Sequence, residues 1–296
     1  DKTEGPLKVF VRTIRNLTDL RLVTWLLIMS CFWLMMYTLW DLQPNFLTDW
    51  NDSGDVAGLF ARVPIVPDGW VVETDRGPQV PQELLLNLNA VLIVALMIPV
   101  SWLVRKLKTL ESMVIGMTMA TVGVLVAGFT NVGFMFLLGV VGFSLGEMLT
   151  GPKKNEYLGL ISPPGKKGLY LGYVNIPVGL GGWIGSWLQG FVYGRWGEKA
   201  VLAQKYLAEK TAAAAGGAWD GDIARLDEVT GVTRPEAFAR LMEVTGLDAA
   251  AATHMLWETY SPQYAVWIPF ASIGVAAIIA LVVFARMARR WSDMNA

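Results

Sequence analysis

Long apolar runs alternate with short charged segments along most of the chain. Six runs approach the roughly 20 residues that an α-helix needs to cross a bilayer. They lie at 22–42, 84–104, 113–129, 132 to at least 150, 168–193 and 264–284. Only Thr130 and Asn131 separate the third run from the fourth, which predicts a tight helical hairpin. The pattern therefore predicts an all-α polytopic membrane protein with six transmembrane helices.

The composition supports this class of protein. Of the 296 residues, 54% are apolar and 17% are charged, whereas about 25% are charged in a typical soluble domain. The net charge of −1 argues against a basic nucleic-acid binder, so the lipid bilayer is the expected partner and nucleic acid is not. One cysteine and one histidine exclude an intrachain disulfide framework and a metal site rich in these residues. No nucleotide-binding, metalloprotease or nucleophile motif is present, so we expect neither a cofactor nor an enzyme.

Lysine and arginine are unevenly distributed among the segments between the apolar runs. They are frequent before the first run, at 105–108, at 153–167 and in the tail, whereas segment 44–83 carries only Arg62 and Arg76. Because Lys- and Arg-rich loops stay in the cytoplasm, both termini are predicted to be cytoplasmic. We expect an integral membrane protein, and its expected location is the bacterial inner (plasma) membrane.

Four parts follow one another along the chain. They are a cytoplasmic amphipathic lead-in (1–21), five transmembrane helices with an extracytoplasmic acidic loop at 44–83 (22–194), an extracytoplasmic helical insertion (195–262), and the last transmembrane helix with a basic tail (263–296). Helices are predicted at 201–215, 235–244 and 248–257 of the insertion, and a short hairpin is predicted within 44–83.

Among the polar residues of the predicted spans, Glu147 has the highest expected free-energy cost of burial in the membrane. If its helix continues through Pro152 toward Leu160, Glu147 lies near the middle and shares a stripe with Lys154. Ionisable residues inside a span mark functional sites; the alternative is a glutamate that reaches water at the cytoplasmic surface. Pro152 removes a backbone hydrogen bond and bends a helix, which suits a gating helix but also occurs in static bundles.

Aromatic residues near the end of the first span form a second candidate. Trp33, Tyr37 and Trp40 share one helical face, and Asp41 lies one turn after Tyr37. Such a stripe lines a solute cavity or forms an interfacial aromatic belt, and the sequence leaves both interpretations open.

Two further features concern the second and fifth spans. Asn87 and Asn89 flank Leu88, so only one of the two amides can face the interior. Gly181 and Gly185 have the small-xxx-small spacing that lets helices approach closely, and we interpret them as packing residues.

A family resemblance rests on several of these landmarks. The stretch Gly-Glu-Met-Leu-Thr-Gly-Pro-Lys-Lys-Asn-Glu-Tyr at 146–157, followed by the prolines and glycines of 163–172, resembles the tenth and eleventh spans of proton-coupled oligopeptide transporters. Those transporters belong to the major facilitator superfamily. Phe32 and Trp33 resemble a Phe-Trp pair of the family's seventh span, and 88–90 resembles its Leu-Asn-Pro at the eighth. The resemblance covers nearly the whole chain except 195–262.

The resemblance implies the C-terminal six-helix half of a proton-coupled transporter for a peptide or amino-acid-like solute. Glu147 then engages the solute's amino group, and Asn89, Trp33, Tyr37 and Tyr157 line the path. The chain departs from the family where an acidic residue of the seventh span is replaced by Tyr37, and where the eleventh-span Trp falls at about Val174.

Such a transporter rocks two six-helix halves around a site at their interface. Six helices alone therefore line only half of the cavity. The chain is then part of a twelve-span protein, or a half that pairs with a separate N-terminal half. The third explanation is a transporter-derived half that serves as a non-transporting structural or assembly subunit of a larger membrane complex. The size of the insertion favours an interaction role.

Overall fold

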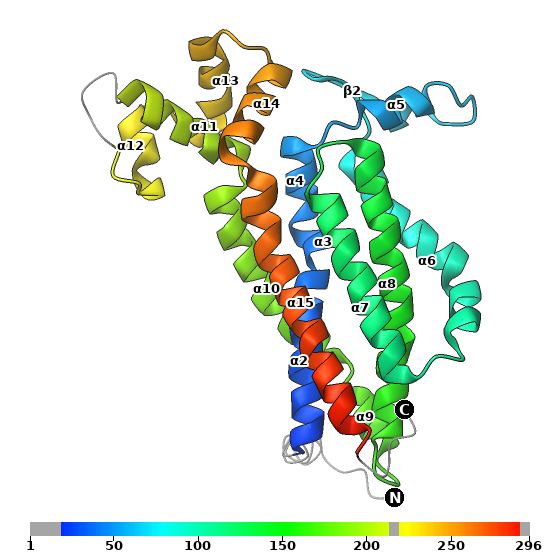
Figure 1. Ribbon diagram of the computed structural model, residues 1–296. Helices are drawn as coiled ribbons and strands as arrows, with labels where there is room; N and C mark the ends of the chain where they lie inside the picture. Colours follow the sequence, from blue (N-terminus) through cyan, green and yellow to red (C-terminus); the bar gives the residue numbers. More distant parts are fainter. Residues whose placement is uncertain (1–18, 213–218, 291–296) are drawn as a thin grey trace, which may run out of the picture.

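A bundle of long helices forms the body of the molecule, and smaller elements gather at one end of it (Figure 1). The fold is taken from a computed structural model that describes residues 19–212 and 219–290. Most of the predicted lead-in lies outside the described residues. The bundle contains α2 (Leu20–Met36), α6 (Gln82–Val104), α7 (Thr109–Gly128), α8 (Gly133–Leu160), α10 (Asn175–Trp196) and α15 (Pro262–Ala288).

Five helical stretches of the described chain are long and apolar enough to cross a membrane. They are Leu20–Asp41, Gln82–Val104, Thr109–Gly128, Gly133–Leu160 and Pro262–Ala288. The first combines α2 with the short α3 (Thr38–Asp41). The chain is thus an all-α polytopic membrane protein, as the sequence predicts.

The sixth predicted span corresponds to α10, which is preceded by the short helix α9 (Lys167–Gly172). Its 22 residues correspond to about 33 Å of helix, and it lies in the bundle beside α2 and α15. It contains several glycines and the buried Gln189, and unlike the other five stretches it has no segment apolar enough to count as a candidate span. Five candidate spans are therefore present in the described chain, and α10 as a sixth stays a prediction.

The hairpin of α7 and α8 is the closest helix pair of the bundle, and it confirms the predicted hairpin. The two helices are joined by residues 129–132 and meet through glycine and alanine. A Cβ atom on Gly146 would lie 2.7 Å from the Cβ of Ala120, so only glycine allows this approach. Phe136, Val140 and Met117 fill the adjacent core and are fully buried.

Segment 43–81 covers one end of the bundle. It contains α4 (Gln43–Trp50), α5 (Gly54–Phe60), the 3₁₀ turn η1 (Asp68–Trp70) and the strands β1 (Val72–Thr74) and β2 (Gly77–Gln79). The strands pair antiparallel with Val72 opposite Gln79, which confirms the predicted hairpin.

The cap, residues 195–262, is helical. It contains α11 (Lys199–Leu207), the π turn η2 (Ala208–Ala212), η3 (Ile223–Arg225), α12 (Leu226–Thr230), α13 (Arg234–Thr245) and α14 (Ala249–Tyr260). The helices predicted at 235–244 and 248–257 are observed as α13 and α14. The helix predicted at 201–215 begins earlier, at Lys199, and passes into the π turn after Leu207; residues 213–215 lie outside the described chain.

A small joint fixes the cap to the bundle. The indole Nε1 of Trp50 donates to the carbonyl of Gly197 over 2.7 Å. The Oδ2 atom of Asp49 accepts hydrogen bonds from the hydroxyl of Tyr193 at 2.5 Å and the backbone N–H of Lys199 at 3.0 Å. We call Asp49, Trp50, Tyr193, Gly197 and Lys199 the cap joint.

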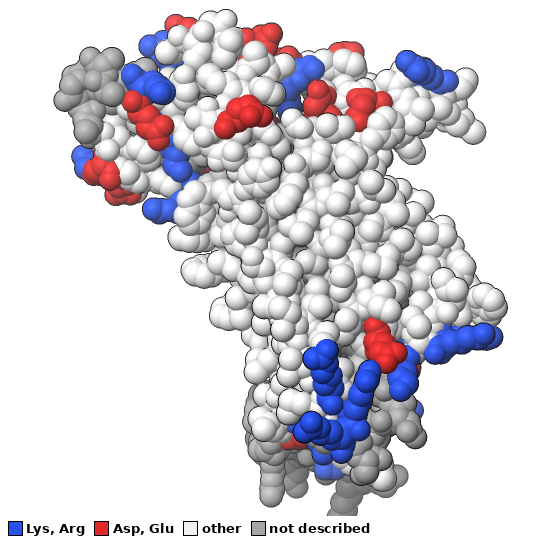
Figure 2. All heavy atoms as spheres, viewed as in Figure 1, with Lys and Arg blue, Asp and Glu red and all other residues white. Residues whose placement is uncertain are grey.

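Charged side chains gather at the two ends of the molecule, and the wide band between them is almost free of them (Figure 2). The lower end in this view carries mainly Lys and Arg, and Arg289 of α15 pairs there with Glu111 of α7 at 3.3 Å. The upper end carries both signs. An uncharged band is what hydrocarbon requires; the assignment of the basic end to the cytoplasm remains a prediction.

Candidate functional site

Glu147 lies near the middle of α8, because the helix continues through Pro152 to Leu160 as predicted. The side chain of Glu147 is partly buried, whereas Pro152 is exposed on the helix surface. Glu147 is therefore held within the bundle rather than at a helix end.

An amide from a neighbouring helix orients this carboxylate. Asn89 of α6 is 5% exposed, and its Nδ2 donates to Oε2 of Glu147 at 3.1 Å and to Oγ of Ser144 at 3.0 Å. The Ser144 hydroxyl donates in turn to the carbonyl of Val140 at 2.7 Å. Asn87 is exposed, so Asn89 is the inward-facing member of the predicted pair.

A lysine and a tryptophan complete the arrangement. The Nζ atom of Lys154 lies 4.4 Å from the ring centroid of Trp33 on α2, a cation–π contact. The positive charge of Lys154 also acts on Glu147, two helical turns earlier on the same stripe of α8. We call Glu147, Asn89, Ser144, Lys154 and Trp33 the Glu147 cluster.

A row of aromatic rings extends from this cluster along α2 and α3. Ring centroids are 6.1 Å apart between Trp33 and Tyr37, 6.1 Å between Tyr37 and Trp40, and 5.7 Å between Trp40 and Phe143 of α8. Trp33 and Tyr37 are partly buried, and Trp40 is 43% exposed. The predicted aromatic face therefore exists and borders the Glu147 cluster.

Helix α10 packs against α2 through small residues and adds a second polar pair. A Cβ on Gly181 would lie 2.6 Å from the carbonyl oxygen of Ser30, and one on Gly185 would lie 3.2 Å from that of Leu34. This close approach is what the small-xxx-small spacing predicts. Ser186, the residue after Gly185, donates its hydroxyl to the carboxylate of Asp41 at 2.5 Å.

Tyr157 does not join the other predicted residues. It is fully buried and stacks on Trp25 with centroids 5.1 Å apart, and its edge contact with Phe284 spans 6.1 Å. At about 100° per residue, Lys154 lies within about 20° of Glu147 around α8, whereas Tyr157 is about 80° away. The structure therefore places Tyr157 in the core among α2, α8 and α15.

Ser144 and Ser186 are polar members of this region that the sequence interpretation missed. Ser144 precedes Glu147 by three residues, so it lies on the same helical face as Glu147 and Lys154. The spacing rule that identified Lys154 would therefore also have identified Ser144. Ser186 has no comparable signal, because its partner Asp41 lies 145 residues away in the chain.

Comparison with known proteins gives one match. A stretch of 107 residues, 36% of this chain, is 28% identical to an uncharacterized MFS-type transporter, YqjV, of Bacillus subtilis (strain 168). The match covers 26% of that relative, so this chain spans well under half of its length. No family model matches the chain, and no solved structure matches it. The similarity is to an MFS-type transporter, which accords with an integral membrane protein.

Proposed function

We propose that this chain is the C-terminal half of a secondary transporter that moves a small solute by alternating access. The observation that carries the proposal is the Glu147 cluster, a partly buried carboxylate in the middle of a spanning helix, oriented by Asn89. A charge at such a position is costly to maintain. The similarity of part of the chain to an MFS-type transporter supports the same class of function.

The chemistry of the cluster favours a solute that carries an amino group. A carboxylate accepts hydrogen bonds from an ammonium group, and Lys154 already supplies one such charge within the protein. Among the described residues Lys154 acts on Glu147 through its charge while its Nζ lies over the Trp33 ring, so a solute amine can pair with the carboxylate directly. Trp33 and Tyr37 offer aromatic surface for the apolar parts of a peptide or amino-acid-like solute.

Proton coupling follows from the same carboxylate. A protonated Glu147 attracts an ammonium group far less, so proton binding from one side would release the solute. We assign Glu147 this double role, with Pro152 allowing α8 to bend and the close contact of Gly181 and Gly185 letting α2 and α10 move as one unit.

A second half is needed to close the cavity. Trp183 and Trp187 of α10 are 77% and 71% exposed, and Val94 and Ile98 of α6 are 86% and 81% exposed. We propose that an N-terminal transporter half, or another membrane subunit, covers part of this surface and that lipid covers the rest.

Uptake measurements test the role of Glu147. The complete transporter is reconstituted into liposomes with an imposed pH gradient, and uptake of radiolabelled dialanine is measured. Glu147→Gln keeps the size of the side chain and one acceptor oxygen for Asn89 but removes its charge, so uptake should fall by about 100-fold (about 2.7 kcal/mol). Glu258→Gln on the exposed face of α14 is the matched control. Uptake by Glu147→Gln equal to that of the control would refute the proposal.

The alternative function is a non-transporting structural or assembly subunit, and the cap favours it. The cap has a small buried cluster of its own, formed by Val201, Ala208 and Leu226, and is tied to the bundle through the cap joint. In this case Glu147→Gln leaves assembly with partner proteins intact, while deletion of the cap releases them. Assembly that survives the deletion would count against this alternative.

A further inference from the structure

Two grooves lie between α7 and α15, two helices that contribute no residue to the Glu147 cluster. The first groove has a volume of about 470 Å³, and its apolar walls include Leu110, Val114, Ile115, Val282 and Ala285. The second has a volume of about 580 Å³ and lies farther from the C-terminal end of α15, where its walls include Val275, Ala276 and Ile279. The two grooves therefore follow one another along the same helix pair.

Two arginines and a glutamate line the first groove at the C-terminal end of α15. Arg286 and Arg289 lie one turn apart on this helix, and both are exposed. Arg289 pairs with Glu111 of α7 at 3.3 Å, whereas Arg286 has no ion-pair partner among the residues that the structure describes. The groove therefore carries a net positive charge, and the Arg286 guanidinium offers its donors to an anion from outside the chain.

The arginines lie at the depth where lipid headgroups meet hydrocarbon. Figure 2 shows Lys and Arg gathered at the lower end of the molecule, below the wide uncharged band. From Arg286 to Ala276, α15 rises about 15 Å at 1.5 Å per residue, which is half of the ~30 Å hydrocarbon core of a bilayer. An acyl chain of one leaflet therefore reaches from the arginines through the first groove to the edge of the second.

The exposed side chains along the grooves are apolar. Ile115 of α7 and Val275 and Ile279 of α15 are between 43% and 59% exposed. No charged residue follows Glu111 in α7 or precedes Arg286 in α15. A small hydrophilic anion would pair with the arginines but leave these apolar walls uncovered. The groove therefore favours a ligand that joins an anionic group to a hydrocarbon chain.

We propose that the first groove binds one anionic phospholipid. Its phosphate pairs with Arg286 and Arg289, because the planar guanidinium group binds phosphate through two parallel hydrogen bonds. One acyl chain lies between α7 and α15. The basic end is the predicted cytoplasmic side, and the cytoplasmic leaflet carries the anionic lipids that attract Lys and Arg next to a membrane. The site is separate from Glu147, so the proposal holds whether or not Glu147 carries solute.

Two charges near the phosphate determine the specificity of the site. The ammonium group of a zwitterionic phosphatidylcholine would lie beside the two arginines, which repel it, so a lipid with net negative charge is favoured. Glu111 acts against the phosphate, because the phosphate competes with this carboxylate for Arg289. Affinity should therefore fall when an arginine is neutralised and rise when Glu111 is neutralised.

Binding of radiolabelled dioleoyl-phosphatidylglycerol to the purified full-length protein in detergent tests the proposal. Scintillation proximity measures the bound lipid. We expect saturable binding, and unlabelled dioleoyl-phosphatidylcholine, which has the same acyl chains, should compete at least tenfold less well than unlabelled phosphatidylglycerol. Arg286→Gln should weaken the affinity about fivefold. Arg105→Gln, at the exposed end of α6, removes the same charge outside the groove and should retain the original affinity.

Neutralising Glu111 gives a change of the opposite sign. Glu111→Gln frees Arg289, so the affinity for phosphatidylglycerol should rise about two- to fivefold. Glu83→Gln, on the first turn of α6, is the matched control and should leave the affinity unchanged. Unchanged or weaker binding by Glu111→Gln would overturn the proposed competition between this carboxylate and the lipid phosphate.

Two competitors distinguish a bound lipid from a bound ion. Inorganic phosphate and glycerol 3-phosphate carry the anionic group without acyl chains, so neither should displace phosphatidylglycerol more than chloride does at the same ionic strength. Displacement by either one would make this an ion site, and the lipid proposal would be wrong. Absence of saturable binding, equal competition by phosphatidylcholine, or equal affinities of Arg286→Gln and Arg105→Gln would also overturn it.

Discussion

Asp49 is the residue on which docking of the cap depends most directly. Its Oδ2 atom accepts from the hydroxyl of Tyr193 and the N–H of Lys199, and its backbone carbonyl accepts from Nζ of Lys199 at 3.1 Å. Asp49→Asn preserves the size of the side chain but removes its charge. The substitution therefore tests electrostatics at the joint with little change in packing.

The expected loss can be worked from these contacts. A hydrogen bond to a charged group contributes about 1.5–3 kcal/mol, and a neutral one contributes about 0.5–1.5 kcal/mol. Tyr193 belongs to α10, so of these two bonds only the one from the Lys199 N–H joins the Asp49 carboxylate to the cap, and weakening it costs about 1 kcal/mol. The partly buried ammonium group of Lys199 also loses a nearby opposite charge, which brings the total to about 1–3 kcal/mol. At 1.36 kcal/mol per tenfold change, cap opening should increase about 5- to 160-fold.

Hydrogen exchange measures this opening directly, because the N–H of Lys199 is itself bonded to Asp49. In Asp49→Asn, the amides of 199–207 should exchange faster by the factor above, while those of α7 should not change. Asp75→Asn, at the exposed turn of the hairpin, is the matched control. Exchange across 199–207 that equals that of the control would refute the electrostatic account of the joint.

Two further predictions concern pH and helix packing. Burial lowers the pKa of Lys199 from 10.5 to about 8, against the opposing effect of Asp49. Between these two values the docked cap therefore binds fewer protons than the undocked cap. Docking should consequently strengthen by at most about tenfold from pH 7 to pH 9. Hydrogen exchange, corrected for its intrinsic pH dependence, measures this change. Weaker docking at pH 9 would contradict this sign. Gly181→Val should lower the unfolding free energy by about 1–3 kcal/mol in detergent, because its Cβ meets the α2 backbone. Gly179→Val has open space around its Cβ and should shift the melting temperature much less, so equal shifts would exclude a packing role for Gly181.

The sequence predicted the features that depend on local pattern. Apolar runs located the five observed spans, and two residues between runs predicted the α7–α8 hairpin. Placing Glu147 in mid-helix needed only the assumption that α8 continues through Pro152. These features follow from helical geometry and hydropathy within one segment, so no tertiary information was needed.

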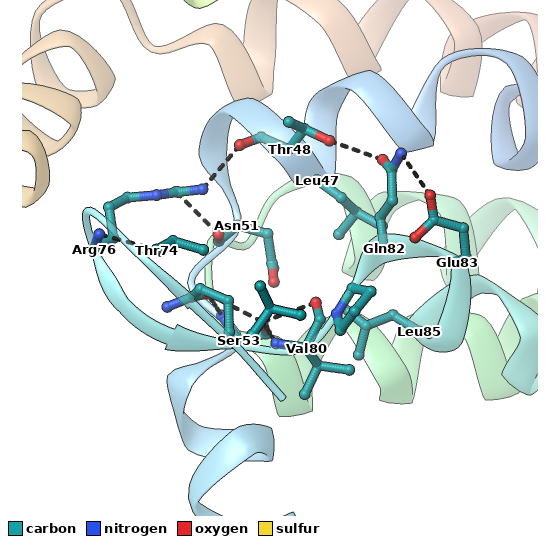
Figure 3. Close-up of a pocket in the computed structure, with 13 residues that line it drawn as sticks. Leu47, Thr48, Asn51, Ser53, Thr74, Arg76, Val80, Gln82, Glu83 and Leu85 are labelled. Carbon is teal, nitrogen blue, oxygen red and sulfur yellow. Dashed lines mark hydrogen bonds between the residues drawn. The ribbon is translucent and has the colours of Figure 1, made fainter. Parts of the chain in front are cut away.

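Features that depend on contacts between distant segments were not predictable. Asn89 was selected as a candidate, but its bond to Glu147 joins α6 to α8 across 58 residues. Tyr157 was grouped with Glu147 by family resemblance, although its helical phase directs it to Trp25 instead. The pocket between α4, the β1–β2 hairpin and α6 (Figure 3) forms only when the hairpin folds back over α4, and no spacing in the sequence indicates that closure.

The position of the polar residues on the bundle limits what can cover them. Trp33, Tyr37 and Glu147 are only partly buried, and Asp41 is exposed beside them. A carboxylate that faces hydrocarbon at mid-helix is unstable, so this face borders water or another polypeptide. A water-filled cavity would let Glu147 exchange protons and solute, and replacing its charge would then stop transport. A face permanently sealed by another subunit would make the same replacement nearly neutral, because Gln keeps a hydrogen-bond acceptor for Asn89. The single substitution Glu147→Gln therefore separates the transporter from the structural subunit.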